Sequence, residues 1–300
     1  MNSAADSIPK RLNSTLISDY YQLTKPRITF AVVITMWVGF MLGTFGSFDF
    51  LLMFHATLGT WLIASGTAAY NQFMERNLDG LMKRTEKRPL PAKRIPAKNS
   101  RIFSLSLIFL GSVYLISIVN LAAGATSLAT TIIYLGAYTP MKRISYTNVF
   151  VGAIPGALPP VGGWAAAGGS LLEPGIWLVF AIMFLWQVPH VMAIAWFCKD
   201  DYGHAGFKML PKNDEEGRVV SFWVFVCTLA LFPVSYYLFE LDTAGITFLI
   251  GSMLLAIMYF YYGILFIRNR SREQAKKLMF AAIAYLPFIS LLFFIDRLVS

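Results

Sequence analysis

Three oxygen-bearing side chains recur at every fourth position near the end of an apolar segment: Asn71, Glu75 and Asp79. On an α-helix this spacing projects them from one face, with a drift of about 40° per step. Oxygen is the ligand that Mg²⁺ prefers, and proteins usually hold Mg²⁺ through one or two carboxylates together with substrate phosphates. These residues, hereafter the oxygen stripe, therefore predict a metal-binding helix face.

Basic side chains follow the oxygen stripe along the chain. Guanidinium groups match the geometry of phosphate oxygens, and ammonium groups also bind them. We therefore expect this region to hold a metal-bound diphosphate, with candidate ligands Lys83, Arg84, Arg88, Lys142, Arg143 and Lys199. The alternative is a solvated loop with Glu75–Arg76 and Asp79–Lys83 salt bridges. The apolar sequence around the start of the stripe favours a binding site, because polar groups inside a membrane are costly and usually functional.

A second acidic segment, Lys199-Asp200-Asp201-Tyr202, follows another apolar run and could supply a second metal pair. Adjacent residues on a helix cannot point in the same direction, and we favour Asp201 over Asp200 as the ligand. Two acidic clusters around a metal would stabilise the negative charge that grows on a departing diphosphate. The candidate metal ligands are Glu75, Asp79, Asp200 and Asp201, and the candidate catalytic residues are Asn71, Glu75, Asp79 and Asp201.

The elements that must position these residues are long and apolar. Of the 300 residues, 57% are hydrophobic and 14% are charged, whereas soluble domains carry about 25% charged residues. The apolar runs are long enough to cross the roughly 30 Å hydrocarbon layer as helices, which pair all their backbone groups internally. We predict an all-α polytopic membrane protein with nine spans, near 28–46, 51–72, 103–119, 121–140, 147–168, 174–197, 219–239, 243–267 and 277–296.

Lysine and arginine are concentrated in alternate connections between these spans. If the N-terminus is cytoplasmic, every basic residue except Arg297 falls on the cytoplasmic side, in agreement with the positive-inside rule. We therefore predict a cytoplasmic arm over 1–27, a single transmembrane domain over 28–297, and a C-terminus outside the cytoplasm. The predicted location is the cytoplasmic (inner) membrane. This topology explains the net charge of +9 through the lipid bilayer, without nucleic acid as a partner.

The fifth span is rich in glycine and proline and contains Pro155, Pro159 and Pro160. Each proline removes one backbone hydrogen bond from a helix. We therefore expect this helix to be irregular. In a membrane, irregular backbone is tolerated only against protein or a water-filled cavity, so the fifth span is expected to lie inside the bundle.

Six segments carry a resemblance to a known family, and they are 71–79, 82–91, 138–148, 152–160, 186–190 and 201–211. In order and spacing they resemble the intramembrane aromatic prenyltransferase superfamily. The Glu at position 75 and the Arg-Thr-x-x-Arg-Pro sequence from Arg84 resemble, within it, the protohaem IX farnesyltransferases, also called haem O synthases. The resemblance covers about residues 20 to 295. The acidic segment 212–217 and Val191 depart from the usual family sequence.

The resemblance implies a helical bundle around a central cavity that opens on the cytoplasmic side. It implies a magnesium-dependent reaction in which farnesyl diphosphate ionises, a vinyl group of haem B attacks the allylic cation, and water captures the resulting cation to give haem O. His190 and Gln187 are then expected to contact haem, although His190 could also be an ordinary satisfied polar residue. Haem A synthase or a terminal oxidase assembly is implied as a partner.

Two other functions remain open at this point. A quinone-pathway prenyltransferase that acts on an aromatic acid such as 4-hydroxybenzoate would share the diphosphate site but would not need His190. A transporter with broken helices would take up its substrate without forming a covalent product. Metal-ligand motifs gathered on one side of the membrane favour an enzyme over a transporter.

Overall fold

The computed structural model describes residues 15–44 and 46–299. Lys10 and Arg11, which count towards the predicted cytoplasmic charge, lie outside the described residues. Within those two ranges every regular element is a helix. The elements are α1 (Leu16–Leu23), α2 (Pro26–Leu42), α3 (Phe50–Asp79), α4 (Ala97–Tyr114), η1 (Leu115–Val119), α5 (Leu121–Ile132), η2 (Ile133–Tyr138), α6 (Thr139–Met141), α7 (Asn148–Ala166), α8 (Pro174–Phe197), α9 (Lys199–His204), α10 (Arg218–Glu240), α11 (Ile246–Arg268) and α12 (Arg272–Val299).

The chain is a multi-pass membrane protein, as its sequence predicted. In the described part of the chain, 8 helical segments are long and apolar enough to cross a membrane, or 9 if the pair α1 and α2, bent by 46°, forms one span. Large apolar side chains such as Phe109 on α4 and Leu254 on α11 are exposed. Such a surface suits contact with lipid, because lipid tails do not drive apolar side chains inward.

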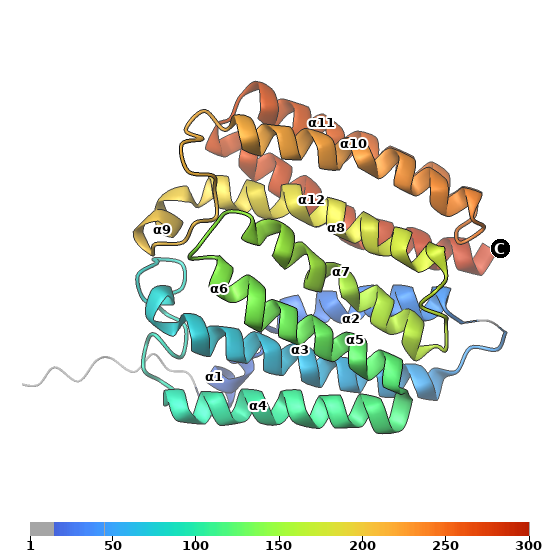
Figure 1. The fold of residues 1–300 in the computed structure, drawn as a ribbon, viewed down its shortest axis with the longest axis horizontal. Coiled ribbons are helices and arrows are strands. Elements are labelled where there is room, and N and C mark those ends of the chain that lie inside the picture. Colours follow the sequence, from blue (N-terminus) through green and yellow to red (C-terminus); the bar gives the residue numbers. More distant parts are fainter. Residues whose placement is uncertain (1–14, 45, 300) are drawn as a thin grey trace, which may run out of the picture.

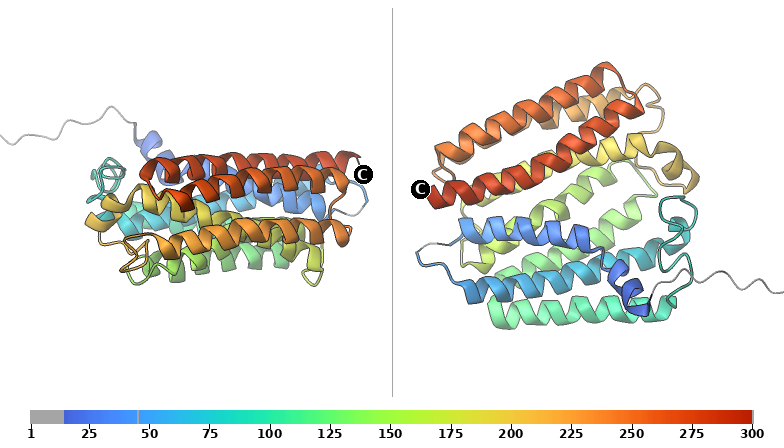
Figure 2. Two further views of the ribbon diagram at one scale, coloured as in Figure 1. Left: turned by 90° about the horizontal axis from the view of Figure 1, so that it is seen from above. Right: turned by 180° about the vertical axis from the view of Figure 1, so that it is seen from behind.

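The helices lie side by side along the long axis of the molecule (Figure 1). α3 packs against α2 and α4, and α7 lies between α2, α5 and α8. α8 contacts α10 and α12. The C-terminal helix α12 also contacts α2, so the two ends of the described chain pack together in the bundle. The connection 80–96 and α9 lie at one end of the bundle, whereas the C-terminus lies at the other end (Figures 1 and 2).

The predicted irregularity of the fifth span is wrong, because α7 is a continuous α-helix through Pro155, Pro159 and Pro160. Of the apolar stretch of α7, 78% is buried inside the protein. Neighbouring helices therefore surround α7 where the prolines remove hydrogen-bond donors. The approach to α2 is close. A Cβ atom on Gly39 would lie 1.7 Å from the carbonyl oxygen of Pro160, so only glycine allows this contact.

The helix that begins as α5 passes through the π-helical turn η2 before it ends as α6. A π-turn inserts one residue into a helix and frequently marks a functional site. The Thr139 hydroxyl donates to the Tyr134 carbonyl oxygen at 2.8 Å and so stabilises this wider turn. Tyr134 and Tyr138, which lie within η2, both line the internal cavity.

Candidate active site

The oxygen stripe lies on the last turns of α3, next to the connection 80–96. α3 continues past the predicted end of its span at residue 72 and carries Asn71, Glu75 and Asp79 on one helix, as their spacing predicted. All three are buried, with exposed fractions of 0%, 6% and 1%. Buried polar groups, and buried charges above all, are costly unless they are paired, so these side chains require partners.

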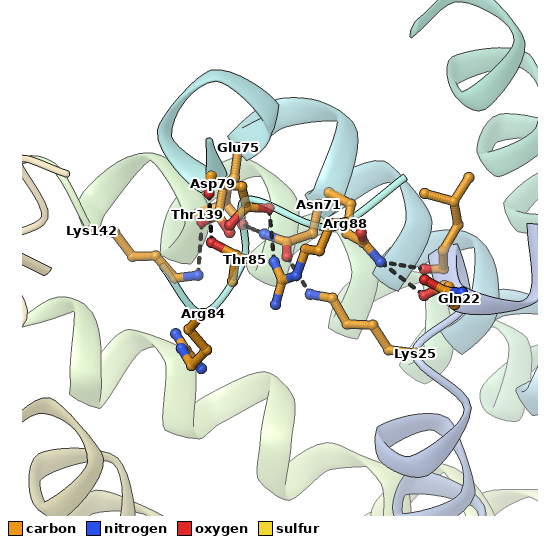
Figure 3. A network of polar contacts seen from close by, with 12 residues as sticks. Gln22, Lys25, Asn71, Glu75, Asp79, Arg84, Thr85, Arg88, Thr139 and Lys142 are labelled. Atoms are coloured by element: carbon orange, nitrogen blue, oxygen red, sulfur yellow. Dashed lines mark hydrogen bonds and ion pairs between the residues drawn. The ribbon is translucent and has the colours of Figure 1, made fainter. Parts of the chain in front are cut away.

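Each residue of the oxygen stripe holds one basic side chain from another part of the chain (Figure 3). The pairs are Lys25 Nζ and Asn71 Oδ1 at 2.7 Å, Lys142 Nζ and Glu75 Oε1 at 2.8 Å, and Arg88 Nη1 and Asp79 Oδ2 at 2.7 Å. The three bases come from the start of α2, the turn after α6 and the connection after α3. The stripe thus gathers three basic side chains side by side, hereafter the cation row (Lys25, Lys142 and Arg88).

Lys142 lies just beyond the span that ends at Met141, and its side chain is only 13% exposed. Its ammonium group lies 4.6 Å from the centre of the Tyr138 ring. Burial by itself would lower the pKa of Lys142, but Tyr138 and Glu75 outweigh burial and raise the pKa above its ordinary value. Lys142 therefore remains a cation throughout the physiological pH range.

The turn after α3 brings Arg88 back to the helix that it follows. The Thr85 hydroxyl donates to the Asp79 carbonyl oxygen at 2.7 Å and closes this turn. Arg88 then reaches the carboxylate of Asp79, and Arg84 donates to the Tyr202 hydroxyl at 3.2 Å. The Arg-Thr-x-x-Arg sequence therefore folds the connection over the end of α3 and directs its arginines toward two different elements.

Lys25 is a site residue that sequence reasoning did not single out. It precedes Pro26 at the start of α2 and has φ of 47° and ψ of 60°, the left-handed conformation that side-chain-bearing residues rarely adopt. This conformation directs the chain sharply from α1 into α2 while the ammonium group reaches Asn71. The signal in the sequence was a lysine immediately before a proline at the start of the first apolar run.

α1 is fastened to the site from the other side. Arg94 Nε and Asp19 Oδ1 are 2.8 Å apart, and Arg94 Nη2 and Gln22 Oε1 are 3.3 Å apart. On α3, Gln72 Nε2 donates to the carbonyl oxygen of Gln22 at 3.1 Å. These contacts tie α1 to α3 and to the connection 80–96, and so they fix the position from which Lys25 enters the cation row.

The second acidic segment forms α9 at the same end of the bundle. Asp200 is exposed and paired with Arg272 of α12, whereas Asp201 is half-buried. The connection 80–96 meets this segment through the Arg84–Tyr202 bond. The Lys208 backbone N–H donates to the Lys142 carbonyl oxygen at 2.6 Å and so joins the segment to the turn after α6. Across residues 15–44 and 46–299, no group of three or more His, Cys, Asp and Glu residues is arranged to hold a metal. The roles of Asp200 and Asp201 as ligands stay predictions.

The remaining candidate phosphate ligands surround this end of the molecule without entering the cation row. Lys83, Arg84, Arg143 and Lys199 are all exposed. The Lys199 ammonium group lies 5.4 Å from the centre of the Trp196 ring. Their positive charge attracts an anion toward this end of the bundle, while the half-buried cation row is placed to bind it.

A cavity of about 260 Å³ adjoins the cation row and lies between α2, α3, α5, η2 and α7. Two residues link the cavity to the row. Lys25 lines the cavity and contacts Asn71, while Tyr138 lines the cavity and contacts Lys142. A molecule with a charged head and an apolar tail therefore fits with its head at the cation row and its tail between the helices.

A family model described as the UbiA prenyltransferase family matches residues 32–285 of this sequence. The chain belongs to the UbiA prenyltransferase family. It is 41% identical over 288 residues to a protoheme IX farnesyltransferase of Solibacter usitatus, a match that covers 93% of this chain and 98% of the relative. It is 36% identical to the protoheme IX farnesyltransferase of Koribacter versatilis, with 97% of each chain covered. The predicted relationship is confirmed, and the chain is a prenyltransferase.

Solved structures of the UbiA family share this fold. A digeranylgeranylglyceryl phosphate synthase superposes with a TM-score of 0.77 at 16% identity and covers 95% of this chain and 99% of its own. A UbiA homolog from Aeropyrum pernix K1 gives 0.70 at 18% identity, over 89% of this chain and 97% of its own. A UbiA homolog from Archaeoglobus fulgidus, bound to DMAPP and Mg²⁺, gives 0.58 at 16% identity, over 92% and 99%. The all-helical membrane fold is therefore confirmed.

The two residues predicted to contact haem, Gln187 and His190, have different neighbours around α8. Gln187 lines the cavity. The His190 ring stacks on Trp186 with centroids 5.3 Å apart, and Trp186 in turn donates to the Ala282 carbonyl oxygen of α12 at 2.8 Å. His190 is thus packed toward α12 and is not among the residues that line the cavity. Its contact with haem stays a prediction.

Proposed function

We propose that this UbiA family protein transfers a farnesyl group from farnesyl diphosphate to a vinyl group of haem B, with haem O and diphosphate as products. The observation that carries the proposal is the half-buried cation row at the end of a cavity between the helices. The names of the relatives, protoheme IX farnesyltransferases across nearly the whole length of the chain, support the choice of haem as acceptor.

The cation row binds and stabilises the departing diphosphate. As the allylic carbon–oxygen bond breaks, negative charge grows on the diphosphate, and donors already in place stabilise that charge most effectively. Lys25, Lys142 and Arg88 offer such donors from three separate elements. An oxygen on α3 already holds each of these side chains in position before the substrate binds.

The oxygen stripe fits a magnesium ion in its chemistry. Glu75, Asp79 and Asn71 present only oxygen donors, the ligand type that Mg²⁺ prefers, and Asp201 would complete the set from α9. Bound Mg²⁺ would supply further neutralisation of charge on the leaving group. The chain's own contribution is to bury the carboxylates of Glu75 and Asp79 beside their basic partners.

The cavity would hold the farnesyl chain and exclude bulk water from the allylic cation. Tyr134 and Tyr138 line the cavity near the cation row, and the faces of their aromatic rings would stabilise the allylic cation. Gln187 lines the same cavity, and we retain Gln187 and His190 as haem contacts. The reaction would take place in the cytoplasmic membrane with the cation row facing the cytoplasm, and haem A synthase or a terminal oxidase assembly would receive haem O.

The decisive experiment is product analysis with purified protein, farnesyl diphosphate and Mg²⁺, offered either haem B or 4-hydroxybenzoate. We expect farnesylated haem and no prenylated benzoate, as measured by mass spectrometry. Prenylated benzoate alone would refute the proposal in favour of a quinone-pathway enzyme. Uptake of either acceptor into vesicles without any covalent product would refute it in favour of transport.

A further inference from the structure

Gln187 of α8 has hydrogen-bonding capacity that the folded chain leaves unused. Its side chain lines the cavity, and its Oε1 atom is buried without a hydrogen-bond partner among the described residues. Its Nε2 atom makes one long bond, 3.4 Å from the Gly152 carbonyl oxygen. A buried amide oxygen without a partner is costly, so its position beside a cavity indicates that a ligand supplies the missing donor.

The backbone of α7 leaves room for this carboxamide. A Cβ atom on Gly156 would lie 2.0 Å from Gln187 Oε1, so any other residue there would displace the amide group. The terminal torsion of glutamine is broad and roughly two-fold, and the bond from its Nε2 atom to Gly152 is long. The carboxamide can therefore turn its oxygen toward the cavity when a donor is present there.

α7 adds further acceptors to the same wall. Proline has no backbone N–H, so Pro159 and Pro160 deprive the carbonyl groups of Pro155 and Gly156 of the donors four residues ahead. Both Pro155 and Gly156 line the cavity. The continuous helix α7 thus contains two carbonyl groups without a donor four residues ahead, at two residues that line the cavity.

The cavity wall contributed by α3 and α5 is rich in hydroxyl groups. Thr67 Oγ1 and Thr131 Oγ1 are 2.8 Å apart, and Thr131 also donates to the Ser127 carbonyl oxygen at 3.2 Å. These bonds use the hydroxyl hydrogens, so the oxygens remain as acceptors on a wall that all three residues line. An isoprenoid chain has no hydrogen to donate to such groups, whereas a buried water needs two to four polar partners of this kind.

We propose that Gln187 positions the water molecule that captures the second carbocation of the farnesyl transfer. This inference rests on the proposed function and specifies one of its steps. The carbonyl oxygen of Gln187 accepts a hydrogen bond from the water, whose oxygen is then directed at the cation. Pro155, Gly156 and the hydroxyl wall supply the site from which that water comes.

The step balances in atoms and charge. The allylic carbon–oxygen bond breaks and its electron pair leaves with diphosphate, after which the terminal vinyl carbon forms the new carbon–carbon bond. The positive charge then lies on the vinyl carbon next to the porphyrin ring. Water adds its oxygen to that carbon, and the surplus proton passes to the released diphosphate. If no water is in place, the cation loses a proton from its neighbouring carbon, and the product is lighter by one water.

The test compares the ratio of hydroxylated to dehydrated product in variants of the full chain. Purified protein is incubated with haem B, farnesyl diphosphate and Mg²⁺ in ¹⁸O-labelled water, and the product masses are measured by mass spectrometry. We expect Gln187→Leu to lower the ratio by about tenfold or more, the effect of one lost hydrogen bond. Gln187→Glu keeps an acceptor and restores most of the labelled hydroxylated product.

Gln274→Leu is the matched control, because Gln274 on α12 also has a buried Oε1 atom without a partner but does not line the cavity. It is expected to keep the wild-type ratio. A wild-type ratio in Gln187→Leu overturns the inference, and so does a folded Gln187→Leu protein that forms no prenylated product. If Gln187→Leu does not fold, the product ratio is measured in Gln187→Asn instead. A wild-type ratio in Gln187→Asn then overturns the inference. Absence of farnesylated haem with the wild-type protein refutes the proposed function instead.

Discussion

At the scale of single residues, the site consists of matched pairs of an oxygen acceptor and a base. Asn71, Glu75 and Asp79 each hold one member of the cation row, and the Glu75–Lys142 and Asp79–Arg88 pairs keep the two buried carboxylates compensated before any substrate binds. A magnesium diphosphate brings both signs of charge. It therefore allows each base to exchange its partner on α3 for a phosphate oxygen without leaving any charge buried alone.

Lys25 can be tested against a lysine at the same end of the molecule. We expect Lys25→Met to raise KM for farnesyl diphosphate by about tenfold or more, because one charge-assisted hydrogen bond to the diphosphate is lost. Lys83→Met is the control, since Lys83 is exposed and lies outside the cation row. Steady-state kinetics with haem B held constant gives both values. Equal effects of the two substitutions would mean that Lys25 acts only through general positive charge.

Asp79 and Asp200 are both predicted metal ligands, but their surroundings differ. Asp79 is buried beside the cation row, whereas Asp200 is exposed and paired with Arg272. We expect Asp79→Asn to lower kcat by about 10²–10³-fold, the range seen when one group that stabilises transition-state charge is removed, and to raise the Mg²⁺ concentration needed for half-maximal activity. Asp200→Asn should change neither value by more than a few-fold. A larger effect of Asp200→Asn on the Mg²⁺ requirement would reverse the assignment.

At the scale of elements, the sequence predicted the helices better than it predicted their contacts. Hydropathy located the spans, and the spacing of the oxygen stripe placed Asn71 and Asp79 on one helix, although the predicted span ends at residue 72, before Asp79. Lys25 was not recognised, because its partner on α3 is distant in sequence. The continuity of α7 was also missed, since local rules for proline do not include the support that buried neighbours give.

The tie between α1 and the connection 80–96 is expected to stabilise the site as a unit. Arg94 and Asp19 are mostly buried, with side-chain exposures of 14% and 4%, and loss of Arg94 would remove the cation that is paired with this buried carboxylate. We expect Arg94→Gln to lower the free energy of unfolding by about 3 kcal/mol and to raise KM for farnesyl diphosphate, since Lys25 follows α1. Thermal unfolding in detergent and steady-state kinetics measure the two effects.

Arg218→Gln serves as the control for this tie. The Arg218–Glu216 pair is exposed, with side-chain exposures of 78% and 66%, and surface pairs contribute less than about 1 kcal/mol. A loss of stability in Arg94→Gln no larger than that in Arg218→Gln would show that α1 is not fastened through this pair. If Arg94→Gln lowers stability but leaves KM unchanged, the position of Lys25 does not depend on the position of α1.

At the scale of the whole molecule, the acidic and basic parts of the candidate site lie at one end of the bundle. The cation row, the connection 80–96 and α9 lie at this end, while Arg297 lies with the C-terminus at the other end and donates to the Thr44 carbonyl oxygen at 2.7 Å. The charge asymmetry seen in the sequence thus corresponds to a physical separation. A diphosphate is confined to one side of a membrane, because its charge cannot cross the hydrocarbon layer unaided, so orientation decides whether the site can meet a cytoplasmic substrate.

Cysteine labelling can determine that orientation. Cys198 and Cys227 are free, and a background in which both are replaced by serine allows single cysteines at Lys83, beside the site, or at Leu172, in the connection between α7 and α8. Leu172 is 94% exposed, and Lys83 is exposed as well. We expect a membrane-impermeant maleimide to label Leu172→Cys in cells with a permeabilised outer membrane. The same reagent should label Lys83→Cys only in inverted membrane vesicles, because the basic connections remain in the cytoplasm. The opposite pattern would place the cation row outside the cytoplasm, where cytoplasmic farnesyl diphosphate could not reach it.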